Sequence, residues 1–128
     1  MKYISSHDIL IIHALIIEQT GGADGVRDTH LVASAAERPR ATYAKKELYR
    51  GIFEKAAVYL ESLASHHVFI DGNKRTSLAV TARFLFLNKY ELTATNKEVE
   101  EYTVDVATGE HEIKEIAIWL KKHSKKKK

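Results

Sequence analysis

One stretch of the sequence concentrates the side chains that can do chemistry. From His67 to Arg75 the chain reads His-Val-Phe-Ile-Asp-Gly-Asn-Lys-Arg, so an imidazole, a carboxylate and two cations fall within nine residues. Apolar residues with helical spacing precede and follow this stretch. We therefore expect these groups to lie on a short connection between two core helices, where a rigid scaffold can hold a site.

The turn within this stretch predicts an anion-binding site. Gly72 can adopt a positive φ angle, and Asn73 can cap a helix. A helix that begins near Asn73 or Lys74 points its unpaired N–H groups and the positive end of its dipole back into the loop. Lys74 and Arg75 add positive charge there, and an arginine can bind phosphate oxygens through two hydrogen bonds.

Two further groups would make such a site reactive. Asp71, facing a bound polyphosphate, can hold a magnesium ion through its carboxylate. Histidine titrates near neutral pH, so His67 suits the role of a general base, and His66 is the competing candidate.

Each of these residues also has a structural explanation. A histidine can end a helix, Asp-Gly-Asn can form an ordinary turn, and Lys-Arg can be a solvated first helical turn. The order of the residues between two core helices favours a phosphate-handling site with a base beside it.

The run from His67 to Thr76 resembles the signature of the Fic/Doc superfamily, His-x-Phe-x-Asp/Glu-Gly-Asn-Gly/Lys-Arg. Within the superfamily it is similar to the Doc (death-on-curing) toxin branch of type II toxin–antitoxin systems. That branch has a lysine where nucleotide-transferring Fic enzymes have the second glycine, and Lys74 matches it. The longer Fic motif has a second arginine at the position that Leu78 occupies in this chain. Only from His67, and not from His66, do the motif residues fall into register.

The resemblance extends beyond the motif, from the N-terminal helix through residues 38–43 to residues 107–110, so it covers nearly the whole chain. It implies an all-α protein with the compact helical Fic fold, about six helices and possibly a small flap hairpin. Helical periodicity in the sequence indicates the same class. The helices that we expect span residues 5–20, 28–36, 46–65, 73–88, 96–108 and 113–120.

The resemblance implies phosphoryl transfer from ATP to a hydroxyl of a protein, with elongation factor Tu as the target by analogy. His67 would accept the proton of that hydroxyl, and Asp71 would hold Mg²⁺. The residues expected to bind the ATP phosphates are Gly72, Asn73, Lys74 and Arg75. Two alternatives remain open, which are AMP transfer by a Fic-type enzyme and a non-catalytic interaction module. Lys74 favours the kinase, because a lysine fills the space that a glycine would leave for phosphates.

Residues 37–43 break the helical pattern at Pro39 and have an extended, basic character. This region is similar to the flap that clamps the target in relatives, and extended backbone can pair with a substrate strand. The expected target-binding residues are Arg38, Arg40 and Thr42, although both arginines can equally be simple loop charges.

Regulation is expected to come from a second chain. Fic-type enzymes are often blocked by a helix with the pattern Ser/Thr-x-x-x-Glu-Gly/Asn. The spacing from Thr108 to Glu112 matches, but Ile113 follows, so the pattern is incomplete. The resemblance therefore implies a Phd-like antitoxin as the partner.

Composition sets the remaining limits. The 128 residues predict one domain over residues 1–120 and a lysine-rich, disordered tail over residues 121–128. Six of the 20 basic residues lie in that tail, which leaves 14 against 17 acidic residues and a net charge of −3 for the rest. Direct nucleic-acid binding is therefore not expected. The absence of cysteine and of apolar runs near the roughly 20 residues needed to span a membrane favours a cytoplasmic protein.

Overall fold

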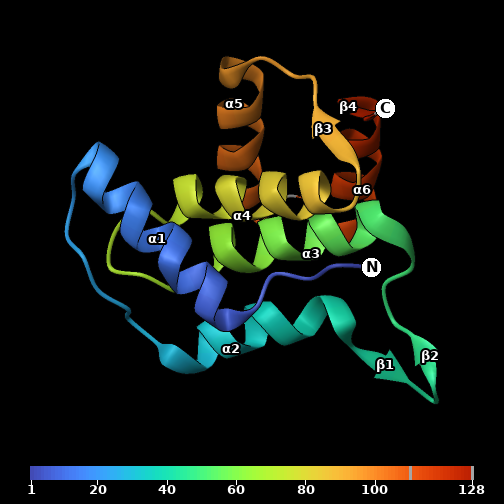
Figure 1. Cartoon of the computed structure of the whole chain (residues 1–128), viewed down its shortest axis with the longest axis horizontal. Coiled ribbons are helices and arrows are strands. Elements are labelled where there is room, and N and C mark those ends of the chain that lie inside the picture. Colours follow the sequence, from blue (N-terminus) through green and yellow to red (C-terminus); the bar gives the residue numbers. More distant parts are fainter. Residues whose placement is uncertain (110, 128) are drawn as a thin grey trace.

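A computed structural model of the protein describes residues 1–109 and 111–127, and in these residues the chain forms six α-helices and two small two-stranded sheets, of which the first is a hairpin (Figure 1). The helices are α1 (Ser6–Thr20), α2 (Thr29–Glu37), α3 (Gly51–Ser65), α4 (Asn73–Leu87), α5 (Asn96–Ala107) and α6 (Ile113–Lys122). A 3₁₀ turn, η1 (Arg38–Arg40), follows α2. The strands are β1 (Thr42–Tyr43), β2 (Lys46–Glu47), β3 (Tyr90–Leu92) and β4 (Ser124–Lys126). The β1–β2 hairpin and the β3–β4 sheet each pair their strands antiparallel.

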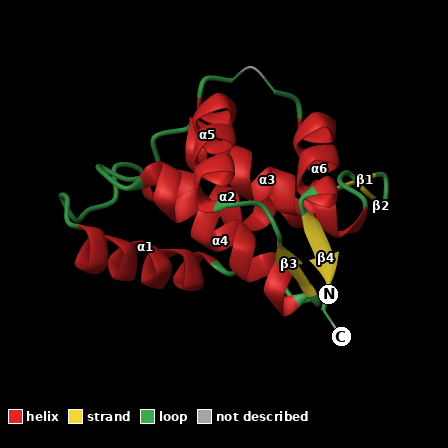
Figure 2. Ribbon diagram, turned by 90° about the horizontal axis from the view of Figure 1, so that it is seen from above, coloured by secondary structure: helices red, strands yellow, loops and turns green. Residues whose placement is uncertain are grey.

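Helix α3 forms the centre of the domain. It lies antiparallel beside α4, with α1 and α2 on one side of the pair and α5 and α6 on the other (Figures 1 and 2). Most of its side chains are buried, as expected for a helix covered on several faces. The short motif connection therefore joins two helices whose relative position is fixed by the core.

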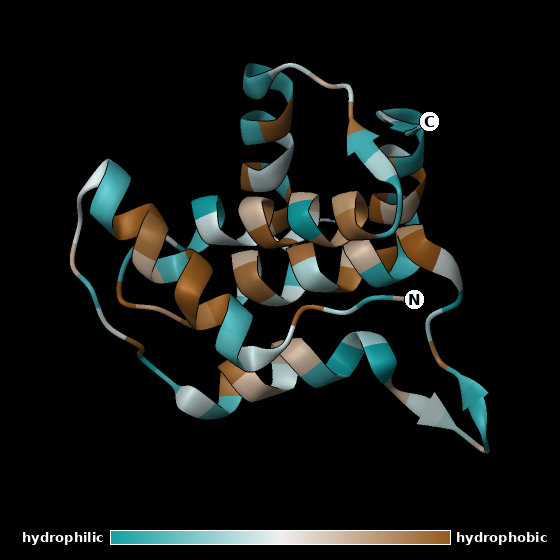
Figure 3. Ribbon diagram, viewed as in Figure 1, coloured by the Kyte–Doolittle hydropathy of each residue, from teal (hydrophilic) through white to brown (hydrophobic). Residues whose placement is uncertain are grey.

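Local sequence signals account for several helix starts. Ser5 and Asp8 form a capping box at the start of α1, and Thr95 and Glu98 form another at the start of α5. The side chain of Asp28 caps α2. In Figure 3, α1 carries long hydrophobic segments, whereas strands β2 and β4 are hydrophilic. The predicted class is confirmed, because the described chain is a compact helical domain with six helices and a flap hairpin.

The predicted start of the central helix at residue 46 is wrong. Residues 46 and 47 form strand β2, in which Lys46 pairs with Tyr43 and Glu47 with Thr42. Arg50 has extended backbone angles, and the helix begins only at Gly51. Residues 38–40 also differ from the expected extended chain, because they form η1. Together, η1 and the β1–β2 hairpin make up the flap of this protein.

The predicted disordered tail is also wrong for residues 121–127. Lys121 and Lys122 are the last residues of α6, and the following residues form β4, which pairs with β3. The ion pair between Lys125 and Glu91 spans 3.3 Å, and the amino group of Lys127 lies 3.1 Å from the ring centre of Phe86. The backbone edge of β3 and the aromatic face of Phe86 therefore give this lysine-rich segment specific partners.

Within the described residues, none of the helices combines the length and the apolar character that crossing a membrane requires.

Candidate functional site

The motif loop between α3 and α4 surrounds a cavity of about 290 Å³. Its lining consists of Ala64, His67, Ile70, Asp71, Gly72, Asn73, Lys74 and Arg75. The structure therefore brings together all the residues that the sequence predicts for catalysis, phosphate binding and metal binding. Val68 and Phe69 are buried beneath the loop and anchor it, while His67, Asp71, Lys74 and Arg75 are exposed.

The start of α4 has the features of an anion site. Gly72 lies in the left-handed region with a φ of 78°, which turns the chain directly into the helix at Asn73. Among the described residues, no side chain caps this helix, and its first turn contains no acidic residue. The first backbone N–H groups of α4 and the cations Lys74 and Arg75 thus lie beside the same cavity.

The side chain of Asn73 also has a structural role in the motif loop. Its Oδ1 accepts a hydrogen bond from the Phe69 backbone N–H, and its Nδ2 donates to the Phe69 carbonyl, both at 2.9 Å. The amide therefore closes the motif loop on itself. The backbone N–H and the second N–H of Nδ2 remain as donors that could face a phosphate.

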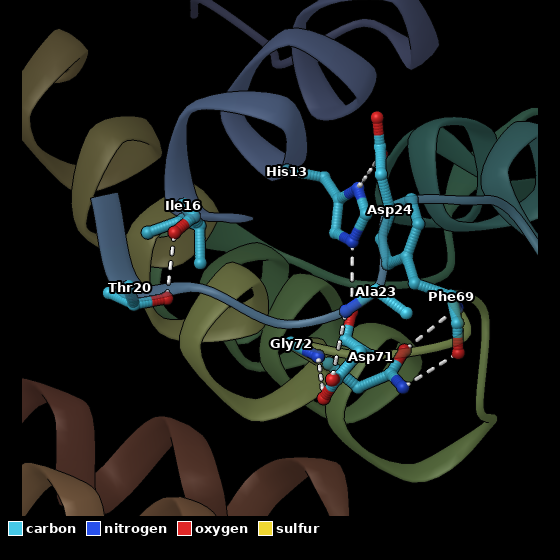
Figure 4. A network of polar contacts seen from close by, with 9 residues as sticks. His13, Ile16, Thr20, Ala23, Asp24, Phe69, Asp71 and Gly72 are labelled. Atoms are coloured by element: carbon cyan, nitrogen blue, oxygen red, sulfur yellow. Dashed lines mark hydrogen bonds and ion pairs between the residues drawn. The ribbon is translucent and has the colours of Figure 1, made fainter. Parts of the chain in front are cut away.

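The carboxylate of Asp71 is held at the edge of the cavity by two backbone groups (Figure 4). Oδ1 accepts from the Gly72 N–H at 2.9 Å, and Oδ2 accepts from the Ala23 N–H at 3.2 Å. A carboxylate has about four lone-pair sites, so it can still bind a cation. Among the described residues, no group of three or more His, Cys, Asp or Glu could hold a metal ion. Asp71 therefore fits a magnesium site that takes its other ligands from phosphates and water.

The connection between α1 and α2 packs along the motif loop. Val26 and Phe69 form a β-bridge, the Arg27 N–H donates to the Val68 carbonyl at 2.9 Å, and the Ile70 N–H donates to the Gly25 carbonyl at 3.2 Å. The close approach of this connection to the motif loop requires a glycine at position 22. A Cβ there would lie 2.7 Å from Asp71 Oδ2.

His13 supports the loop from α1, a role that the sequence reading missed. Its ring is buried and stacks on Phe69, with ring centres 3.8 Å apart and planes 5° apart. Nε2 lies 2.9 Å from the Asp71 carbonyl oxygen, so this nitrogen carries the proton and donates (Figure 4). Nδ1 faces the Asp24 carboxylate at 3.9 Å. Its place on the buried stripe of α1, between Ile9 and Ile17, was the available signal, and such spacing indicates a residue of the core or of the helix face without naming its partners.

A second, largely apolar cavity of about 480 Å³ adjoins the first and shares Lys74 and Arg75 with it. The remaining lining residues are Ile16, Leu78, Ala79, Ala82, Glu100, Thr103 and Val104. Arg75 donates to Thr20 Oγ1 at 3.1 Å, which holds its guanidinium beside α1. The two cations therefore separate a polar cavity from an apolar one.

Only one of the two candidate bases reaches the cavity. His67 lines it and has a φ of 49° in the turn that follows α3. His66 instead lies 3.2 Å from Glu61, and it is not among the lining residues. The geometry therefore agrees with the motif register that selects His67.

The three predicted flap residues lie away from the cavity. Arg38 donates to both oxygens of Glu61 at 3.0 Å and to Ser62 Oγ at 2.9 Å, so its guanidinium anchors the flap to α3. Burial lowers the pKa of Arg38, but the hydrogen bonds and charge of Glu61 more than offset this, and the pKa is raised overall. Arg40 lies 4.9 Å over the Tyr3 ring, and Thr42 is exposed on β1.

These features define a class of protein, a compact helical domain in which a loop–helix junction places backbone N–H groups and two cations beside an exposed imidazole. The chain belongs to the Fic/DOC family, whose model matches residues 3–85. It is 35% identical to Toxin Doc of Mycolicibacterium smegmatis over 121 residues, which cover 93% of this chain and 91% of that protein. It is 32% identical to Protein kinase doc of Escherichia phage P1 over 122 residues, which cover 95% of each chain.

Proposed function

We propose that this protein is a Doc-like toxin that transfers the γ-phosphoryl group of ATP to a hydroxyl of a target protein. The observation that carries the proposal is the single cavity lined by His67, Asp71 and the cationic start of α4. The names of the two relatives, Toxin Doc and Protein kinase doc, support the toxin role and the kinase reaction respectively.

In this reaction the hydroxyl oxygen of a serine or threonine attacks the γ-phosphorus, and His67 takes the proton. The bond from the γ-phosphorus to the bridging oxygen breaks, and ADP leaves with that electron pair. The backbone N–H groups at the start of α4, with Lys74 and Arg75, bind the phosphates and stabilise the charge that develops. Positioning and charge stabilisation of this kind supply most of the catalysis in phosphoryl transfer.

Asp71 would hold the magnesium ion of the nucleotide, which supplies positive charge to the phosphates when bound. The two N–H groups on the carboxylate fix its direction and leave capacity for a cation. His13 keeps the Asp71 backbone in place from beneath.

The choice between phosphoryl and AMP transfer depends on position 74. Lys74 favours the kinase because it occupies space and adds charge beside the anion site. Incubation with Mg²⁺, elongation factor Tu and ATP labelled at the γ- or the α-phosphate separates the two reactions. We expect γ-label in the target protein. Incorporation of the α-label would instead indicate AMP transfer. If the same assay with a whole cell extract labels no protein, a non-catalytic module is favoured.

We further propose that a Phd-like antitoxin is the partner that inhibits the toxin in the cytoplasm. Thr108 ends α5 and Glu112 precedes α6, so the incomplete inhibitory pattern does not lie on one helix. Leu10, Ile11 and Leu15 are exposed on α1, which supports a protein partner there. Expression of the toxin alone should arrest growth, and co-expression of the product of the adjacent gene should restore it. Normal growth with the toxin alone would argue against this role.

A further inference from the structure

A buried lysine fastens both ends of the flap to the central helix. Lys55 lies on α3 and is fully buried. Its amino group donates to the Pro39 carbonyl at 3.0 Å and to the Tyr49 carbonyl at 2.9 Å, and it lies 3.2 Å from the carboxylate of Glu47 on β2. These three acceptors match the three N–H bonds of a lysine ammonium group.

The flap has few other means of keeping its position. Residues 42–48 are all exposed, and a two-stranded hairpin alone is marginally stable in water. Its tip is also strained, because Ala44 and Lys45 have φ values of 51° and 65°. The contacts of Arg38 hold the entry to the flap, whereas those of Lys55 join the entry at Pro39 to the exit at Tyr49.

We propose that Lys55 is a positioning residue that presets the flap, and that it thereby sets the affinity for the protein target without acting on the nucleotide. A preset flap lowers the conformational entropy lost when a target segment binds. Lys55 is not among the residues that line the phosphate cavity, so nucleotide handling should not depend on it. The part of this inference that concerns the target rests on the proposed function.

The first test measures backbone amide hydrogen exchange of residues 41–50 in the full chain. Lys55→Met removes the amino group but keeps much of the side-chain volume. Glu47→Ala removes one acceptor from an exposed position and leaves Lys55 its two carbonyl acceptors. Lys46→Ala, the neighbouring residue of the same strand, is the control. We expect exchange in the flap to rise about tenfold or more in Lys55→Met, because charge-assisted hydrogen bonds are lost. In Glu47→Ala we expect a smaller rise in flap exchange. In both variants the exchange of amides in α4 should not change.

Should Glu47→Ala exchange no faster than Lys46→Ala, the inference is overturned, even if Lys55→Met fails to fold. This readout needs no enzymatic activity, so it decides the role of Lys55 even if the wild-type protein transfers no phosphate and the proposed function fails.

The second test separates the two substrates of the transfer reaction. We expect Glu47→Ala to raise the KM for the protein target while the KM for ATP stays at the wild-type value. An equal rise in both KM values would show a general effect on the site and would contradict a role confined to the flap.

Discussion

At the scale of single residues, the reactive groups depend on side chains that hold the motif loop in place, one within the motif and one outside it. Asn73 closes the motif loop on Phe69, and His13 holds the Asp71 carbonyl from α1. Neither side chain has to contact a substrate, yet the site should fail when either one is removed. Because loop geometry sets the reach of a catalytic base and a metal ligand, these supports should be visible in kinetics.

Replacement of His13 by alanine should lower both stability and turnover. The Asp71 carbonyl would lose its donor, and Phe69 would lose the ring on which it stacks. We expect a loss of about 2–3 kcal/mol in the free energy of unfolding and a fall in kcat. Thermal unfolding and the transfer assay measure both, with the exposed His30→Ala as the control. Wild-type values of both in His13→Ala would contradict the support role.

Two neighbouring glycines offer a matched test of the Asp71 carboxylate. A Cβ at Gly22 would lie 2.7 Å from Asp71 Oδ2, whereas a Cβ at Gly21 would meet nothing within 4 Å. Both residues have positive φ, so Gly21→Ala carries backbone strain without the clash. We expect Gly22→Ala, but not Gly21→Ala, to need more Mg²⁺ for half-maximal transfer. Identical magnesium dependence of the two variants would show that Asp71 does not hold the metal.

At the scale of elements, agreement between sequence and structure depends on whether the signal is local. The capping boxes at Ser5 and Thr95 involve residues three positions apart, and the helices that follow them begin within one residue of the predicted positions. The motif was predicted as one cluster because its residues are contiguous. The start of α3 was predicted wrongly because the residues before Gly51 belong to the flap. Lys55 holds the flap through hydrogen bonds that a helical sequence pattern does not reveal.

Long-range pairing explains the other errors. Strand β4 forms only because β3, more than thirty residues earlier, presents an open edge. His13 and Ala23 reach Asp71 from about fifty residues away in the sequence. A sequence reading identifies such residues as core or loop, but their partners emerge only once the helices are packed.

The strained flap tip gives a prediction at this scale. Lys45 has a positive φ, which costs a non-glycine residue about 1–2 kcal/mol. Lys45→Gly should therefore slow hydrogen exchange within the flap, since relief of strain exceeds the greater entropy loss of glycine. Lys46→Gly on strand β2 should accelerate it. If Lys45→Gly instead accelerates flap exchange, the tip is not strained in solution.

At the scale of the whole molecule, the N-terminal segment before α1 is held against the central helix α3 by the buried side chain of Tyr59. The Tyr59 hydroxyl accepts from the Ile4 N–H at 2.9 Å and donates to the Ile4 carbonyl at 3.2 Å. Burial raises the pKa of Tyr59 from 10.0 to about 12. The folded state therefore binds this proton more tightly than the unfolded state does.

The pH dependence of stability follows from this difference. The contribution of Tyr59 is fully present below pH 10 and is lost as the pH rises from 10 to about 12. A shift of two units corresponds to about 3 kcal/mol. Chemical denaturation across this range should show the loss in the wild-type protein and a shallower loss in Tyr59→Phe. Equal slopes for the two proteins would contradict the assignment.

We propose that His67, as the general base, and the start of α4, as the phosphate-binding element, act together on one bound nucleotide. The most direct measurement compares γ-phosphoryl transfer by the wild-type protein and by His67→Ala, with ATP binding measured on both. We expect kcat of His67→Ala to fall about a hundredfold or more while ATP affinity is unchanged, because only the general base is removed. Transfer by His67→Ala at the wild-type rate would contradict it.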